Sequence, residues 1–269
     1  MATQIAKAQQ LRALHEQGTF ILPNFWDVGS ARVLERLGFL ALASTSAGFA
    51  QTIGKLDSTV TLEEKLMHLT QVCSATDVPV SADFEHGFAN APRQCAENLL
   101  RVAEAGAVGA SIEDWSRTEM YDINHATDRI AACVEALASL DYPFTLTART
   151  EVLLRRTGDL DEAITRLQAY DAAGADVLYA PGLSSTEQIQ TLKESVTKPI
   201  NVLVAFMPDL TFRAYDELGV RRISLGSTLA NRALGAVLQA SNQMLEQGDF
   251  MWSMDAAPGN VINSLLAPN

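Results

Sequence analysis

Two carboxylates stand at the end of a short apolar run, where the sequence reads Val78-Pro-Val-Ser-Ala-Asp-Phe-Glu-His-Gly87. If this run is a strand, Asp83 and Glu85 are alternate residues at its carboxyl end and point to the same side. Two like charges this close repel each other unless a cation lies between them or one of them holds a proton. The pair therefore indicates either a cation site or a strand end with solvated acids.

Polar side chains end the other apolar runs of the chain in the same way. The residues placed like this are Asn24, Trp26 and Asp27, Ser44, Thr45 and Ser46, Glu113 and Asp114, Arg149, Asn201 and Ser224. With Asp83 and Glu85, Glu113 forms an oxygen ligand set for a hard cation such as Mg²⁺, which takes one or two carboxylates directly and keeps several waters. Arg149 is suited to pair with a substrate carboxylate or phosphonate, or simply to neutralise the acids. The turn Ser46-Ala-Gly48 offers backbone N–H groups to an anion.

These side chains need strands and helices that bring them together. Apolar runs predict strands over 20–27, 39–43, 78–82, 107–112, 144–150, 176–180, 200–205 and 222–226, with a helix after each. Four of the helices end in glycine (Gly38, Gly106, Gly174 and Gly219), which takes the left-handed helix-ending conformation without steric cost. Short apolar strands separated by helices are typical of a parallel sheet that is buried on both faces.

Eight such units predict an α/β fold of the (β/α)8 type, a TIM barrel. We expect a single domain over 1–269, with 228–269 as a C-terminal helical arm. The alternative is a doubly wound open sheet. No strand is followed by the Gly-x-Gly-x-x-Gly dinucleotide motif, which makes that alternative less favourable.

The composition limits the classes of molecule that the protein is expected to bind. The chain has 269 residues, of which 48% are hydrophobic, and a net charge of −12, which argues against nucleic acid or an anionic membrane as a partner. The sequence shows neither an apolar run of the ~20 residues that a membrane span needs nor a signal-peptide core, so we expect a cytoplasmic protein. Cys73, Cys95 and Cys133 lack metal-ligand spacing and are predicted to be buried, reduced thiols.

Several motifs keep a common order along most of the predicted barrel. They are Asn24-Phe-Trp-Asp27 with Gly29-Ser-Ala-Arg32, Thr45-Ser-Ala-Gly48, Asp57, Asp83-Phe-Glu85, Ile112-Glu-Asp114 and Ala148-Arg-Thr150. In these motifs the chain resembles the isocitrate lyase/phosphoenolpyruvate mutase superfamily. The resemblance implies a Mg²⁺-dependent barrel, with Mn²⁺ as an alternative ion, that binds a small 2-oxo acid and stabilises its enolate.

The resemblance also implies roles for individual residues. Asp83 would be the main metal ligand, with Glu85, Glu113 and Asp57 acting through bound water. Ser46, Ala47 and Gly48 would hold the substrate carboxylate, while Trp26 and Arg149 would line the pocket, which we expect Asn201 to line as well. Arg149, Glu113 and Asp57 are the residues expected to take part in catalysis, Arg149 by stabilising negative charge as it develops.

The segment Trp115 to Asn124 departs from the known branches of this superfamily. The lyases resemble one another in a Lys-x-Cys-Gly motif whose cysteine is the acid, and the phosphonopyruvate enzymes carry a lysine and an asparagine. This chain has no cysteine or lysine here, and Arg117, Thr118, Glu119 and Tyr121 are its polar candidates to cover the mouth.

Three functions stay open. The first is a carbon–carbon lyase or decarboxylase on a substrate such as oxaloacetate, from which CO₂ leaves without a proton donor. The second is a phosphonopyruvate mutase or hydrolase, and the third is a 2-oxo acid binder with little turnover.

The apolar stretch Met251 to Leu266 follows the last predicted strand and has no barrel strand left to cover. An exposed apolar patch of this kind usually marks an interface. In the superfamily the terminal helices resemble arms that are exchanged between subunits. We therefore expect a homotetramer assembled through the C-terminal helices.

Overall fold

Parallel strands close into a barrel in the computed structural model, which describes residues 2–267. In sheet order, the strands of these residues are β1 (Phe20–Leu22), β9 (Arg222–Ser224), β8 (Ile200–Leu203), β7 (Val177–Tyr179), β6 (Thr145–Arg149), β5 (Gly109–Glu113), β4 (Val80–Asp83), β3 (Leu42–Ser44) and β2 (Asn24–Phe25). Pro23 separates β1 from β2, because proline has no N–H to continue the ladder. Since β1 pairs with β9 and β2 pairs with β3, this interrupted first strand closes the sheet. The (β/α)8 barrel is confirmed, and the open sheet is excluded.

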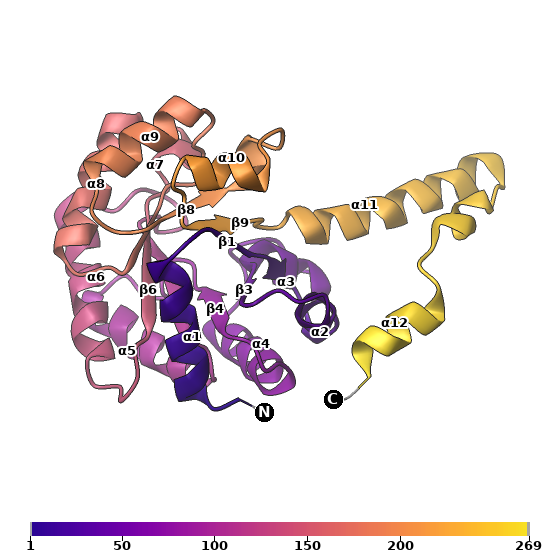
Figure 1. The fold of residues 1–269 in the computed structure, drawn as a ribbon, viewed down its shortest axis with the longest axis horizontal. Helices are drawn as coiled ribbons and strands as arrows, with labels where there is room; N and C mark the ends of the chain where they lie inside the picture. The colour runs from indigo at the N-terminus through magenta and orange to yellow at the C-terminus, as the bar shows by residue number, and fades with distance from the viewer. Residues whose placement is uncertain (1, 268–269) are drawn as a thin grey trace.

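Helices cover the outside of the barrel (Figure 1). Those of the described barrel residues are α1 (Gln4–Glu16), α2 (Val28–Arg36), α3 (Ser46–Thr52), α4 (Leu62–Ala75), α5 (Pro92–Glu104), α6 (Ile123–Leu137), α7 (Val152–Arg155), α8 (Leu160–Ala172), α9 (Thr186–Ser195), the 3₁₀ turn η1 (Val204–Phe206) and α10 (Phe212–Glu217). The predicted glycine connections are confirmed, with φ of +95° at Gly38, +99° at Gly106, +101° at Gly174 and +72° at Gly219.

Several predicted boundaries differ from the structure. The strand predicted over 20–27 is split at Pro23, and the strand predicted over 200–205 ends at Leu203, after which the 3₁₀ turn η1 begins. At the start of α9 the Ser185 side chain accepts the Gln188 N–H, while the Ser184 N–H donates to the Gln188 side chain. The short helices α3 and α7 were not predicted, because each has too few residues to show a helical period.

The C-terminal arm leaves the barrel as one long helix and then turns back (Figure 1). It comprises α11 (Thr228–Asn242), the π-helical turn η2 (Gln243–Gln247), the 3₁₀ turn η3 (Met251–Asp255) and α12 (Gly259–Leu266). In this single chain α12 lies against α2 of the same chain, and the Arg36 guanidinium donates to the Ala267 carbonyl at 2.8 Å. Exchange of the arm between subunits therefore stays a prediction.

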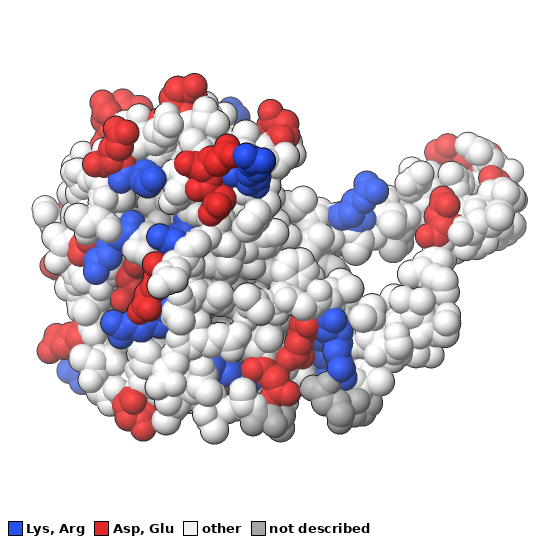
Figure 2. All heavy atoms as spheres, in the orientation of Figure 1, with Lys and Arg blue, Asp and Glu red and all other residues white. Residues whose placement is uncertain are grey.

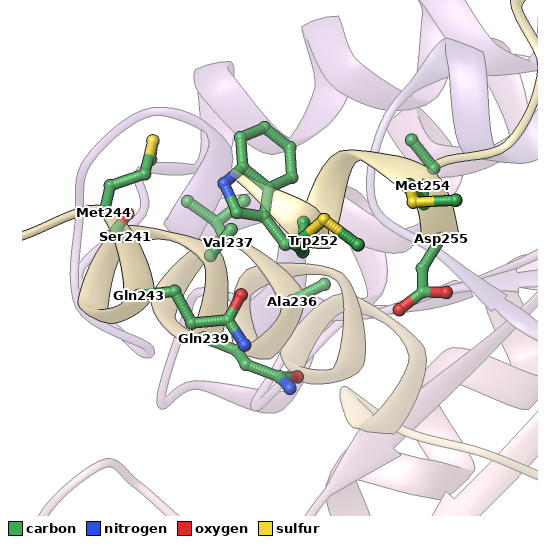
Figure 3. A pocket seen from close by; sticks show the side chains of 12 residues that line it. Ala236, Val237, Gln239, Ser241, Gln243, Met244, Trp252, Met254 and Asp255 are labelled. Atoms are coloured by element: carbon green, nitrogen blue, oxygen red, sulfur yellow. The ribbon is translucent and has the colours of Figure 1, made fainter. Parts of the chain in front are cut away.

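One cavity lies on this arm rather than on the barrel. It has a volume of about 720 Å³ and lies between α11 and η3, with Val237, Met244, Trp252 and Met254 among its lining side chains (Figure 3). Apart from Asp255, which reaches its edge, the lining is uncharged. It is an apolar groove without the acids or cations that the predicted chemistry needs.

Two further expectations concern the whole chain. None of the helices described in residues 2–267 combines the length and apolar character that crossing a membrane requires.

The three cysteines are buried and free, as predicted. Cys95 and Cys133, which are distant in sequence, lie with their sulfurs 3.8 Å apart.

Candidate active site

The register of the parallel strands brings the predicted site residues to one level of the barrel. Glu113 pairs with Arg149 across β5 and β6, Arg149 with Tyr179 across β6 and β7, and Tyr179 with Asn201 across β7 and β8. On the other side of β5, Asp83 pairs with Ser111. Because parallel strands end at the same mouth, these side chains converge there.

Arg149 is the centre of the charged network. Its Nη1 lies 3.4 Å from Asp83 Oδ1, and its Nε lies 3.6 Å from Glu113 Oε2. Its shortest ion pair, at 2.6 Å, is with Glu151, a buried residue that the sequence analysis missed. The guanidinium also stands 5.3 Å from the centre of the Tyr179 ring. Arg149 is thus held by three carboxylates, which fix its position at the mouth.

Asp83 is held ionised by its surroundings. Its Oδ2 accepts the Ser46 N–H at 2.9 Å, and its own N–H donates to Ser44 Oγ at 2.9 Å. Burial is the largest influence on its pKa and acts to raise it. The charges of Arg149 and Lys65 and the Ser46 hydrogen bond outweigh burial, so the pKa of Asp83 lies below its usual value.

Glu85 also lies at the mouth, but the backbone conformation that places it there differs from the predicted one. The strand β4 ends at Asp83, so strand alternation does not place Glu85. It occupies a turn with φ of +47°, a left-handed conformation that costs a non-glycine residue on the order of 1 kcal/mol. Its Oε2 pairs with Arg117 Nη2 at 3.2 Å, and its Oε1 is buried without a hydrogen-bond partner among the described residues. Burial raises the pKa of Glu85.

Glu113 is the most strongly perturbed acid of the group. Burial raises its pKa well above the ordinary value, and Arg149 opposes this rise. The neighbouring charges of Glu151, Asp83 and Glu85 raise it further. Asp83, Glu85 and Glu113 are called the carboxylate cluster below. Strongly shifted carboxyl groups that share one mouth are typical of active sites.

Lys65 is a second residue that the sequence analysis missed. It belongs to α4, has no exposed surface and donates from Nζ to Ser44 Oγ at 3.1 Å. Burial lowers its pKa, while the charges of Asp83, Glu85 and Asp57 raise it. Its position in a helix that opens with a capping box gives no sign of this, because the local sequence does not show which helix side chains reach the barrel mouth.

Some predicted site residues lie at the edge of the cluster. Asp57 is exposed and accepts the Ser58 N–H, although its charge influences Glu85 and Lys65. Asn201 is buried inside the barrel, where its amide donates to Ser224 Oγ at 2.9 Å and accepts from Arg222 Nε at 2.8 Å. Trp26 lines a separate cavity of about 270 Å³ beside Phe49 and His68. Asn201 nevertheless lines a small cavity of about 50 Å³ together with Asp83 and Arg149, as predicted for a pocket residue.

The predicted anion turn is the first turn of α3. The Ser46 N–H donates to Asp83, and the Gly48 N–H donates to Thr45 Oγ1 at 3.3 Å. No partner is recorded for the Ala47 N–H among the described residues. A Cβ on Gly48 would stand 2.5 Å from Thr45 Cγ2 and 3.0 Å from the Trp26 Cβ, so only glycine fits here.

One charged side chain of segment 115–124 contacts the carboxylate cluster. The Arg117 guanidinium bonds to Glu85 and to the Val60 carbonyl. Glu119 is exposed, and the Tyr121 hydroxyl donates to Asn90 at 2.5 Å. Thr118 is exposed as well and bonds within a local turn with Ser116.

The donors of this site have the chemistry that a divalent cation needs. The carboxylate cluster supplies oxygen ligands, and the buried Glu85 Oε1 is an acceptor without a partner. However, no three acidic, histidine or cysteine side chains within 2–267 converge closely enough to form a metal cage by themselves. Arg149 and Arg117 already pair with the acids. A metal ion would therefore fit this donor set only with a shift of these ion pairs.

A (β/α)8 barrel with buried carboxylates and an arginine at its mouth has the features of a barrel enzyme. A model of the phosphoenolpyruvate phosphomutase family matches residues 11–245, so the chain belongs to that family, within the isocitrate lyase/phosphoenolpyruvate mutase superfamily. The resemblance seen in the motifs is confirmed.

Three relatives illustrate the range of this superfamily. The chain is similar to a solved protein of Burkholderia cenocepacia J2315 whose assignment as a lyase or mutase is provisional, with 44% identity, a TM-score of 0.95 and coverage of 98% and 97% of the two chains. It is similar to solved 2,3-dimethylmalate lyase, with 25% identity, a TM-score of 0.85 and coverage of 99% and 96%. It is 28% identical over 226 residues to an oxaloacetate decarboxylase of Rhodopseudomonas palustris strain HaA2, which covers 80% of this chain and 75% of the relative.

Proposed function

We propose that this protein is a metal-dependent carbon–carbon lyase that removes CO₂ from a small 2-oxo dicarboxylate such as oxaloacetate. The proposal rests on the side chains of segment 115–124. Within residues 2–267, no carboxyl or phenol group of this segment is recorded in contact with the carboxylate cluster. The segment contributes Arg117 there, while Glu119 is exposed and Tyr121 is bound to Asn90. Relatives named oxaloacetate decarboxylase support the same choice.

Decarboxylation suits such a site because the departing CO₂ is neutral and needs no acid, and the enolate left behind takes its proton at C3 from water to give pyruvate. Cleavage of a C–C bond to a carbanion-like fragment does need one, and acid help is typically worth ~10²–10⁴-fold. The bonding electrons move toward the oxo group of the substrate, so a fixed positive charge at that point lowers the barrier. Arg149, locked by Asp83, Glu113 and Glu151, is such a charge.

The carboxylate cluster would hold the metal, Mg²⁺ or Mn²⁺, with Asp83 as the direct ligand and with Glu85 and Glu113 acting through water. When bound, the ion would supply a Lewis acid for the oxo oxygen. The chain itself contributes the orientation of Arg149 and the ion pair between Arg117 and Glu85.

The test is a set of turnover assays on the full-length protein. Pyruvate formed from oxaloacetate would be followed through NADH with lactate dehydrogenase, with and without MgCl₂. The no-enzyme rate corrects for spontaneous loss of CO₂. We expect Mg²⁺-dependent pyruvate formation, and background release of glyoxylate from isocitrate. Robust isocitrate cleavage would contradict the proposal, and binding of oxaloacetate without turnover would favour a 2-oxo acid binder.

A phosphonopyruvate mutase or hydrolase is the second candidate, because the family that matches the chain is named after a phosphomutase. The segment 115–124 lacks the lysine of those enzymes, and Arg117 is engaged with Glu85. Release of phosphate from phosphonopyruvate, or its conversion to phosphoenolpyruvate, would decide for this candidate against the decarboxylase.

A further inference from the structure

Lys65 is fully buried and is linked to the carboxylate cluster through a single oxygen atom. Its Nζ donates to Ser44 Oγ at 3.1 Å, and the same Oγ accepts the Asp83 N–H at 2.9 Å. The ammonium therefore lies beside Asp83, the residue that would be the direct metal ligand. It reaches this place from α4, which lies between β3 and β4 in the chain.

The charge of Lys65 is balanced without a close ion pair. Among the described residues no carboxylate oxygen is recorded within 4.0 Å of its Nζ, and Ser44 Oγ is its only recorded hydrogen-bond partner. A buried charge without compensation is strongly unfavourable. The compensation comes from Asp83, Glu85 and Asp57, which are the acids that stabilise its charged form.

We propose that Lys65 is a tethered cation that balances the carboxylate cluster in the absence of metal and opposes a divalent ion when one binds. It would then set the metal affinity of the site without touching the metal or the substrate. The inference rests on the proposed metal-dependent function. Its physical basis is that like charges at one buried site repel each other in a medium that screens them less than water does.

The test compares metal affinities of the full-length wild type and Lys65→Met, measured by titration calorimetry with MgCl₂ at pH 8. Methionine has a similar length but no charge. We expect Lys65→Met to bind Mg²⁺ about tenfold more tightly, because the repulsion from the ammonium is gone.

Lys7→Met is the matched control. Lys7 is also a buried lysine, but its Nζ donates to the carbonyls of Cys73 and Thr76, at the far end of α4 from Lys65. We expect this variant to keep the wild-type Mg²⁺ affinity. Lys65→Arg, which retains the charge, should also stay close to the wild type.

Thermal unfolding with and without MgCl₂ covers the case in which Lys65→Met is unstable. Loss of the ammonium leaves the acids uncompensated, so we expect a lower melting temperature without metal and a larger rise on adding Mg²⁺ than the wild type shows. A variant that folds only with MgCl₂ supports the inference, whereas one that folds in neither condition contradicts it.

The outcomes also separate this inference from the proposed function. If the wild type binds Mg²⁺ and decarboxylates oxaloacetate while folded Lys65→Met has the same or a weaker Mg²⁺ affinity, only the inference is overturned. If neither protein binds Mg²⁺, both the inference and the metal dependence of the proposed function are overturned.

Discussion

At the scale of single residues, the site depends on charges that are kept apart from water and fixed by one another. Asp83 is fixed at three points, because its side chain meets Arg149 and the Ser46 N–H while its backbone meets Ser44. Burial of this kind makes each charge sensitive to the loss of its neighbour. Substitutions at these residues should therefore remove the charge while keeping the shape of the side chain.

We predict that Asp83→Ala and Asp83→Asn both abolish Mg²⁺-dependent binding of 2-oxo acids. Asparagine retains an oxygen for the Ser46 N–H, so Asp83→Asn should keep the fold more fully. Even residues next to metal ligands change affinity by 10–100-fold, so we expect a loss of about 100-fold or more in Mg²⁺ affinity by calorimetry. Wild-type Mg²⁺ affinity in a folded Asp83→Asn variant would remove Asp83 from the metal site.

At the scale of elements, α1 shows how a helix outside the mouth supports the barrel. Ala8 and Leu11 of α1 pack with Phe20 and Leu22 of β1 in one apolar cluster. His15 closes this contact, with Nδ1 2.8 Å from the Leu11 carbonyl oxygen and its ring edge-on to Phe20. Burial, aided by the charge of Arg222, lowers the pKa of His15 from 6.5 to about 3.

This shift predicts a pH dependence of stability. Below pH 6.5 the unfolded chain takes up a proton on His15 that the folded chain does not, so the free energy of unfolding falls as the pH falls from 6.5 toward 3. The loss attributable to His15 is about 1.4 kcal/mol per pH unit. Urea unfolding at pH 7.5 and pH 5 should show a smaller decline for His15→Gln than for the wild type. An equal decline in both proteins would show that His15 is not held neutral.

At the scale of the whole molecule, the arm is an extended and largely uncharged projection (Figure 2). Leu245 is 85% exposed, Met254 75%, Phe250 65% and Leu238 65%, which is an unusual concentration of apolar surface. We propose that other copies of the chain cover this surface in a homotetramer. The first turn of α11 contacts the barrel at Ala230, which is buried next to Gly48.

We predict that truncation after Gly248, which removes η3 and α12, reduces the tetramer to smaller species in light scattering. Leu245→Glu should weaken the assembly as well, because it places a charge on the exposed face of the arm. Leu40→Glu is the control, since Leu40 is also exposed, at 55%, but lies on the barrel before β3. A full-length protein that is monomeric at micromolar concentration would contradict the tetramer.

The sequence by itself determined the barrel and the position of its mouth. Helix-ending glycines such as Gly106, apolar runs and strand-end acids such as Asp83 act locally, through backbone conformation and burial, so they can be read without coordinates. The meeting of Asp83, Glu113 and Arg149 also follows from the sequence, because all parallel strands of a barrel end at one mouth.

Only the tertiary structure decided which side chains complete that mouth. Lys65 reaches it because α4 packs beside β3 and β4, and Glu151 binds Arg149 because the chain turns directly after β6. Glu85 arrives through a left-handed turn, and Asn201 is turned inward to Arg222 and Ser224. Each of these placements depends on contacts between segments distant in sequence or on one backbone angle, and no local pattern of residue types encodes them.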